Sequence, residues 1–310
     1  MRQATMTGSG AKILCAMVVA AVISVPAIAG EQGSFQKTFQ VSGPVELEAY
    51  TRSGDITVHA GNSGTVLVSG KIHVGDHWLS SRQDDVNAIQ NNPPLQQNGN
   101  HIKVDYVNYR NISIDYDITV PAETRVTAHS GSGNETLDGL RGSFNLETGS
   151  GDLKLNNLTG EMNVHTGSGN VHSSNVAGPV DAESGSGDIR LDEKAQGDVH
   201  VRTGSGNLEI RGVNGGLRVQ TGSGDVTVDG TQAGEWDLRA GSGNITIRLP
   251  QTAAFDIDAS TSSGSLDITP PVTMTIQGST EHLRKNVRGK VRGGGPELIV
   301  RTGSGDIRID

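Results

Sequence analysis

The sequence predicts an all-β fold: a single-chain β-solenoid with about 18 to 19 residues per coil. One observation is a turn, Thr-Gly-Ser-Gly followed by Asp or Asn and an apolar residue, which recurs with small variations along most of the chain. The other is its spacing. The middle serines lie 18, 18, 18, 19, 18 and 19 residues apart, at Ser132, Ser150, Ser168, Ser186, Ser205, Ser223 and Ser242. A short fixed period is typical of one small unit stacked on copies of itself.

Each repeat contains two short strands. Leu153 and Leu155 alternate with polar residues, and Met162 and Val164 do so again after a second turn. This alternation has the period of a half-buried strand. Stacking the coils at about 4.8 Å aligns the inward side chains as apolar columns in a thin core. We expect a right-handed coil, by analogy with other β-helices.

Residues 1–29 have the pattern of a secretory signal peptide. Arg2 and Lys12 precede or flank the start of an apolar run at 13–23, and Ala27-Ile28-Ala29 resembles a cleavage site. The single cysteine, Cys15, lies inside this run, so the mature chain is expected to have no thiol chemistry. It keeps 23 basic and 34 acidic residues, a net charge of −11. This acidity argues against nucleic acid as a partner, and no second apolar stretch is long enough to span a membrane.

The repeat extends towards the N-terminus. Gly43-Pro44-Val45 followed by Ser53-Gly54-Asp55 matches the later pattern, so we expect the solenoid to begin near Phe35. One solenoid domain over 30–310 is therefore predicted, interrupted by insertions at about 75–115 and 264–300. In the first insertion, Val86 and Ile89, with Trp78-Leu79 before them, predict a short helix that ends at Pro93-Pro94.

Aromatic residues concentrate in and around the first insertion. A solenoid needs its open ends covered, so capping is one interpretation of this concentration. A ligand platform is the alternative, with Trp78, Tyr106, Tyr109 and Tyr116 as candidate interaction residues.

The second insertion carries the densest basic cluster of an acidic protein. Its residues are Arg284, Lys285, Arg288, Lys290 and Arg292. A solvated hairpin is one interpretation, and contact with anionic lipid or glycan headgroups is the functional alternative. The chain then ends in a strand at 307–310, whose charges are expected to protect an exposed edge.

The residue after each turn alternates between Asn and Asp. The turn positions are Gly151, Asp152, Gly169, Asn170, Gly187, Asp188, Gly206, Asn207, Gly224, Asp225, Gly243 and Asn244. We assign these positions a structural role. Carboxylates about 5 Å apart repel by nearly 1 kcal/mol even in water, and Asn between them relieves this. A two-coil duplication would leave the same pattern. Acids on alternate coils lie too far apart to share a calcium ion, so no metal or cofactor is expected.

These motifs together carry a family resemblance. The turn series, the segment Val120-Pro121-Ala122-Glu123-Thr124 and the ending Gly293-Gly294-Gly295-Pro296 through Ile307 resemble the bacterial putative-adhesin family, a domain-of-unknown-function family related to auto-transporter adhesin head domains. The resemblance covers about 35–310 and implies a β-solenoid at the cell envelope with an adhesive role.

The leading functional prediction is a non-catalytic, exported scaffold that binds an envelope or extracellular polymer or protein. A polysaccharide-acting β-helix enzyme is an alternative, but the acids recur in every coil and the serines have no companion His and Asp at a fixed offset, so no catalytic residues are predicted. An ice- or mineral-binding threonine array is a further alternative. An envelope-stress or cationic-peptide sensor would suit the acidic charge.

Overall fold

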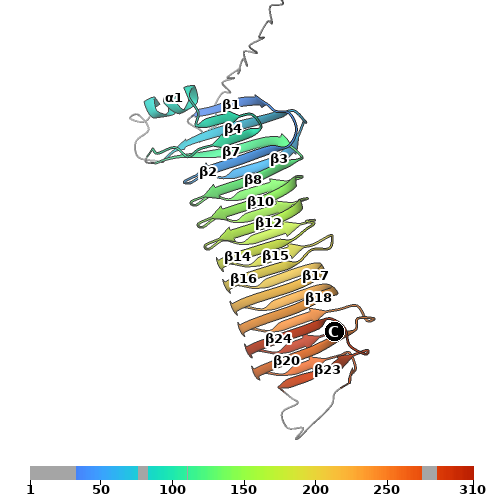
Figure 1. Cartoon of the computed structure of the whole chain (residues 1–310). Coiled ribbons are helices and arrows are strands. Elements are labelled where there is room, and N and C mark those ends of the chain that lie inside the picture. Colours follow the sequence, from blue (N-terminus) through green and yellow to red (C-terminus); the bar gives the residue numbers. More distant parts are fainter. Residues whose placement is uncertain (1–32, 76–82, 110, 274–284) are drawn as a thin grey trace, which may run out of the picture.

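The computed structural model describes residues 33–75, 83–109, 111–273 and 285–310, and this part of the chain forms one elongated all-β stack (Figure 1). The Trp78 and Arg284 candidates and the predicted signal peptide lie outside the described residues. Successive coils pair their strands in parallel with an offset of 18 or 19 residues, as the period predicts; Phe144, for example, pairs with Met162. The fold is therefore solenoid-like, and the right-handed sense stays a prediction.

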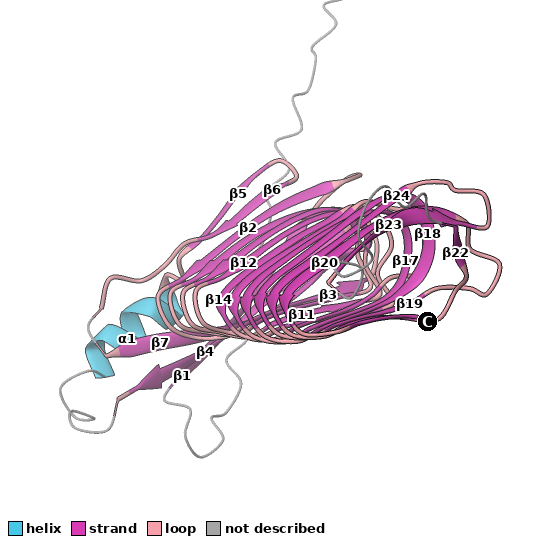
Figure 2. Ribbon diagram, turned by 90° about the horizontal axis from the view of Figure 1, so that it is seen from below, coloured by secondary structure: helices cyan, strands magenta, loops and turns pink. Residues whose placement is uncertain are grey.

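Each coil contributes one strand to each of two faces, and Figure 2 shows the flattened outline that results. In spatial order, the first face consists of β6 (His101–Val104), β2 (Val45–Thr51), β8 (Thr124–Ser130), β10 (Arg141–Thr148), β12 (Thr159–Thr166), β14 (Val180–Ser186), β16 (Val199–Ser205), the second halves of β17 (Leu208–Ser223) and β18 (Val226–Ser242), β24 (Glu297–Ser304) and β20 (Phe255–Ser263).

The second face runs beside it. It consists of β7 (Ile112–Pro121), β3 (Ile56–Gly61), β9 (Glu135–Asp138), β11 (Leu153–Asn156), β13 (Val171–Ser174), β15 (Ile189–Asp192), the first halves of β17 and β18, β19 (Ile245–Arg248), β25 (Ile307–Ile309) and β21 (Leu266–Ile268).

The coils do not stack in chain order at either end. The β2/β3 coil lies between the later coils β6/β7 and β8/β9. At the other end, the final coil β24/β25 lies between two earlier ones, β18/β19 and β20/β21. The prediction of an exposed edge at 307–310 is therefore wrong. Ile307 and Ile309 are fully buried, and strand β25 is bonded on both sides.

Antiparallel strands close the two ends. At the first, β1 (Gly33–Gln40) and β4 (Thr65–Val74) pair with each other, and β4 pairs with β7. The Phe35 segment therefore belongs to this cap, and the stacked coils begin at Val45. Helix α1 (Gln83–Asn91) buries Val86 and Ile89, as predicted, and β5 (Leu95–Asn98) pairs with β6. At the other end, β23 (Asn286–Val291) pairs with β20 and with the short β22 (Val272–Thr273).

The core is a set of stacked columns. Apolar side chains alternate with exposed ones on both faces, because successive residues of a strand point to opposite sides. The turn threonines are also inside: Thr166 is fully buried, and its hydroxyl donates to the Gly151 carbonyl of the preceding coil at 3.0 Å. The turn threonines therefore lie in the core. They do not form the exposed threonine array that an ice-binding function requires.

Turn glycines are required where neighbouring coils touch. A Cβ atom on Gly151 would lie 1.9 Å from the carbonyl oxygen of Gly133 in the preceding coil. No side chain fits at that distance, so the repeated glycine follows from the close approach of two backbones.

Candidate functional site

The Asn and Asp residues of the turns form a continuous hydrogen-bonded ladder. The backbone amide of Asp152 donates to Oδ1 of Asn134 at 2.9 Å, and that of Asn170 donates to Oδ1 of Asp152 at 2.8 Å. Asn170 also donates its side-chain Nδ2 to Asp152 at 3.2 Å, a bond that a second carboxylate cannot make. The turn residues therefore link neighbouring coils through hydrogen bonds.

The alternation in this ladder follows spatial order rather than chain order. Asp306 lies next to Asn244, 62 residues away in sequence, and its amide donates to Asn244 Oδ1 at 2.9 Å. Ser265 follows in space, and its backbone amide and hydroxyl donate to Asp306 at 2.8 and 2.9 Å. These bonds, the backbone one first, hold the pKa of Asp306 below its usual value. In the described ranges, no three His, Cys, Asp or Glu side chains converge as a metal site.

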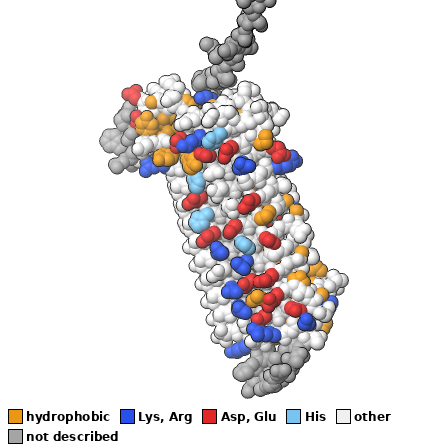
Figure 3. All heavy atoms as spheres, viewed as in Figure 1, with side chains coloured by type: hydrophobic (Ala, Val, Ile, Leu, Met, Phe, Trp, Pro, Cys, Tyr) orange, Lys and Arg blue, Asp and Glu red, His pale blue; other side chains and the backbone are white. Residues whose placement is uncertain are grey.

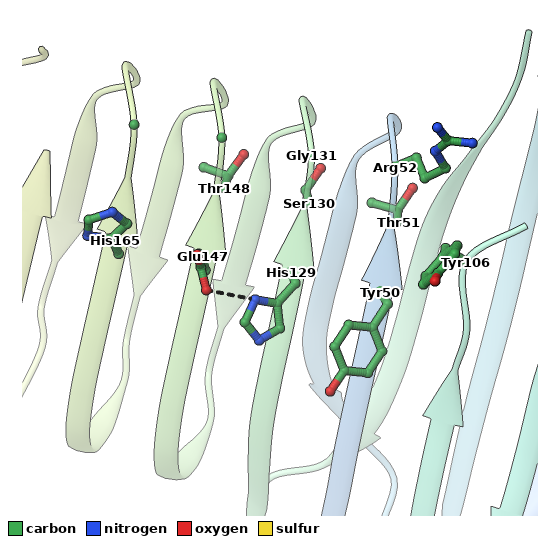
Figure 4. A pocket seen from close by; sticks show the side chains of 12 residues that line it. Tyr50, Thr51, Arg52, Tyr106, His129, Ser130, Gly131, Glu147, Thr148 and His165 are labelled. Atoms are coloured by element: carbon green, nitrogen blue, oxygen red, sulfur yellow. Dashed lines mark ion pairs between the residues drawn. The ribbon is translucent and has the colours of Figure 1, made fainter. Parts of the chain in front are cut away.

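An open groove of about 580 Å³ lies on the first face near the cap (Figure 4). Its side chains come from the loop residues Arg52 and Tyr106 and from strands β2, β8, β10 and β12. They include Tyr50, Arg52, Tyr106, His129, Glu147 and His165, beside the bare turn glycines Gly131, Gly149 and Gly167. The groove thus has one side of polar and aromatic groups and one side of backbone.

Tyr106 supplies the free aromatic surface of this groove, because its side chain is 56% exposed. The faces of Tyr50 are both covered: its ring stacks on His129 with centroids 5.3 Å apart, and Lys103 Nζ lies 5.5 Å from its centroid. Burial, followed by the charge of Glu48, raises the pKa of Tyr50. Tyr50 therefore supports the groove wall, and Tyr106 is the ring that a ligand can stack on.

A column of His and Glu side chains continues from the groove down the first face. His129 pairs with Glu147 at 3.0 Å, and His165 pairs with Glu183 at 3.7 Å. Figure 3 shows histidine and acidic side chains alternating down this face. Strand register places Arg202 next, opposite Glu183. Five equivalent positions on neighbouring coils thus present a regular line of polar groups.

The other aromatic candidates lie apart from this groove. Tyr109 is half-buried and lines a second groove of about 720 Å³ with Arg52 and Asn111. Tyr116 is only 3% exposed and packs against Phe35 in the cap, and burial raises its pKa. Tyr116 is therefore a core residue, and its place on a ligand platform is wrong.

The described residues of the basic cluster are occupied by protein groups. Arg288 pairs with Asp258 at 2.9 Å, and Lys290 pairs with Asp256 at 3.7 Å. The remaining two donate to backbone carbonyls, Lys285 to Ser262 and Arg292 to Ala253. The antiparallel pairing of β23 with β20 brings these acids opposite the basic residues. This arrangement is closer to the hairpin interpretation than to a headgroup-binding site.

Two carboxyl groups are buried inside the stack. Glu135 is fully buried and Glu193 is 3% exposed, and neither carboxyl makes a well-formed hydrogen bond with a described residue. Burial raises the pKa of each from 4.5 to about 8. In the sequence, these two glutamates differ from the other acidic residues only in standing at positions whose side chains point inward.

Sequence reasoning identified Tyr106 but missed Tyr50, His129 and the His–Glu column. These residues are 18 or more positions apart in sequence, and only the coil register brings them together. The repeat period was the signal that could have placed them in one column.

Comparison with known proteins places the chain in a family. The model of the Toastrack DUF4097 family matches residues 23–193 and 95–310, so the chain belongs to that family, as its turn motifs suggested. Among curated proteins, none matches. In the described part of the chain, no helix is long and apolar enough to cross a membrane.

The solved structures that match this chain are distant in sequence. A putative adhesin from Bacteroides fragilis is 13% identical, with a TM-score of 0.42 over 92% of this chain and 100% of the other. A putative adhesin from Parabacteroides distasonis is 11% identical, with a TM-score of 0.40 over 90% and 98%. A putative cell adhesion protein from Clostridium sporogenes is 12% identical, with a TM-score of 0.23 over 88% and 97%.

Proposed function

We propose that this chain is an exported, non-catalytic scaffold of the bacterial cell envelope that binds an extended surface polymer or protein along its first face. The observation that carries the proposal is the open groove in which the exposed Tyr106 ring faces a polar column. The signal-peptide pattern of residues 1–29 supports export. Stacked coils repeat one surface, which suits contact with a repeating ligand.

Binding of the mature chain to soluble polysaccharides and matrix proteins tests the proposal by biolayer interferometry. Tyr106→Ala should weaken binding of the best ligand about two- to tenfold, because ring stacking contributes roughly 0.5–1.5 kcal/mol. Tyr106→Phe keeps the ring and is the matched control, so it should retain most of the affinity.

Three results would contradict the proposal in whole or in part. Absence of binding to every polymer and protein refutes it. Shortened polysaccharide products would replace it with the enzyme interpretation. A salt-sensitive preference for cationic peptides would replace the polymer with a peptide ligand, as a sensor requires.

A further inference from the structure

A further groove, of about 320 Å³, lies on the first face over β16, β17 and β18, and Arg202, Arg218 and Arg239 line it together with Asp237. Strand register puts Arg202, Gln220 and Arg239 in one column on successive coils, and Arg218 stands two residues before Gln220 on the same strand. Over the lower coils, Figure 3 shows Lys and Arg side chains interleaved with Asp and Glu side chains. The groove is therefore assembled by stacking from residues that the sequence separates.

The charges of this groove are unevenly compensated. Arg239 is held by Asp237 through two hydrogen bonds of 2.9 and 2.8 Å. Arg202 and Arg218 are exposed, and in the described part of the chain neither has a hydrogen bond or an ion pair. This contrasts with Arg288 and Lys290, which are matched by acids. Strand register sets Arg202 opposite Glu183 and Arg218 opposite Asp237, so this groove brings together two arginines without ion pairs beside acidic neighbours.

We propose that this groove binds the carboxylate or sulfate groups of an acidic polysaccharide, which deepens the proposed function by naming its ligand class. A guanidinium presents a planar set of donors that matches the two oxygens of a carboxylate or sulfate. Arg202 and Arg218 have their full donor sets available, and the Gln220 amide adds a donor between Arg202 and Arg239.

The geometry favours a polymer over a single small anion. Arg202 and Arg239 are two coils apart in one column, a separation of about 10 Å. Arg301 continues the same column on the next strand, β24, where it shares Asp258 at 3.3 Å. A polymer that lies along the stack can bring one anionic group to Arg202 and another towards Arg239, with the Gln220 amide between them, whereas a single small anion cannot span that distance.

The test measures binding of the mature chain to polygalacturonate, dextran sulfate and neutral dextran by biolayer interferometry over a salt series. The Arg202→Gln, Arg218→Gln double variant should lose at least about tenfold in affinity for the anionic polymers, because charge-assisted bonds of this kind are among the stronger ones. The Lys154→Gln, Arg248→Gln double variant is the matched control. It makes the same charge change at exposed cations of the second face and should bind as the wild type does.

Two further binding measurements distinguish a polysaccharide from a free anion and from a lipid headgroup. Inorganic sulfate and vesicles containing phosphatidylglycerol should bind far more weakly than the polymers, and stronger binding to either overturns the polymer assignment. Equal loss in both double variants, or none in the Arg202, Arg218 variant, overturns the site. Binding of neutral polysaccharide or protein without binding of anionic polymers refutes this inference while leaving the proposed scaffold function standing.

Discussion

Replacing the buried Glu135 with glutamine should remove part of the pH dependence of folding. Glu135 occupies an inward position between Ile56 and Leu153 of the neighbouring coils. Burial raises the pKa of its carboxyl to about 8; the nearby Ser130 amide offsets part of the rise, and the charge of Glu147 adds to it. The folded protein therefore holds this group protonated at neutral pH.

The magnitude follows from the two pKa values. Above its ordinary pKa of 4.5 the carboxyl ionises in the unfolded chain, while in the folded chain it keeps its proton until about pH 8. Below pH 4.5 this carboxyl group does not reduce the free energy of unfolding. As the pH rises from 4.5 towards 8, the free energy of unfolding falls by about 1.4 kcal/mol per pH unit. The loss reaches about 3 kcal/mol at pH 7. Glu193, whose pKa burial and then Asp192 raise to about 8, adds a similar loss.

Urea unfolding followed by circular dichroism at about pH 5, 6, 7 and 8 measures this slope. Glu135→Gln and Glu193→Gln should each reduce the decline in unfolding free energy by about 1.4 kcal/mol per pH unit, and the double variant should reduce it by about twice as much. Glu161→Gln on the exposed face is the control for removing one carboxylate and should keep the wild-type slope. Equal slopes in the wild type and the double variant would refute the reasoning.

Two further perturbations test the stack. Asn170→Asp puts three carboxylates on adjacent coils with Asp152 and Asp188, and should destabilise the protein by about 1–2 kcal/mol at low salt. Urea unfolding should show most of this loss recovered at about 1 M salt, and a salt-independent loss would contradict an electrostatic cause. Deleting 297–310 removes the coil bonded to both β18/β19 and β20/β21, so amides of β20 should lose protection in hydrogen exchange while those of β10 keep it. Protection retained in β20 would contradict the coil order.

Asp152→Asn is the matched control for the ladder. It keeps an Oδ1 acceptor for the amide of Asn170 and removes one charge, so it should not destabilise the stack.

Much of the fold follows from the period alone, but the order of the coils at the ends does not. The spacing of Ser150 and Ser168 fixes which residues stack, and alternation fixes which side chains point inward. The turn at 302–306 has the same sequence as the turn at 221–225, so the local sequence cannot say which coil is its neighbour. Long-range pairing of β24 with both β18 and β20 decides the order.

The candidate sites were harder to predict for a related reason. The sequence cluster at 285–292 drew attention because its charges are close along the chain, yet Asp256 and Asp258 meet them across the antiparallel strand pair. Arg202 and Arg218 stand alone in sequence, and register alone brings them into one groove. In a solenoid, a surface residue often lies nearest to the equivalent residue of the adjacent coil, about 18 positions away in sequence. Residues that are close in sequence are therefore poor guides to residues that are close at the surface.

At the C-terminal end of the ladder, the Asn–Asp alternation can be explained either by contacts between stacked coils or by a two-coil duplication, and the coil order distinguishes the two explanations. A two-coil duplication leaves an alternation in chain order, in which Ser265 follows Asn244 and Asp306 comes last. The structure places Asp306 directly against Asn244, with Ser265 beyond it, so acid meets amide across a 62-residue separation. At the other end Asp55 likewise accepts from Asn134 at 2.8 Å across 79 residues. The alternation stops at the cap, where the amide of Asp55 donates to Oδ1 of Asp115 at 2.9 Å. At the reordered end, by contrast, Asp306 lies between Asn244 and Ser265, which points to a constraint at the contact itself: there the carboxylate has neutral neighbours on both sides, and Ser265 donates to it.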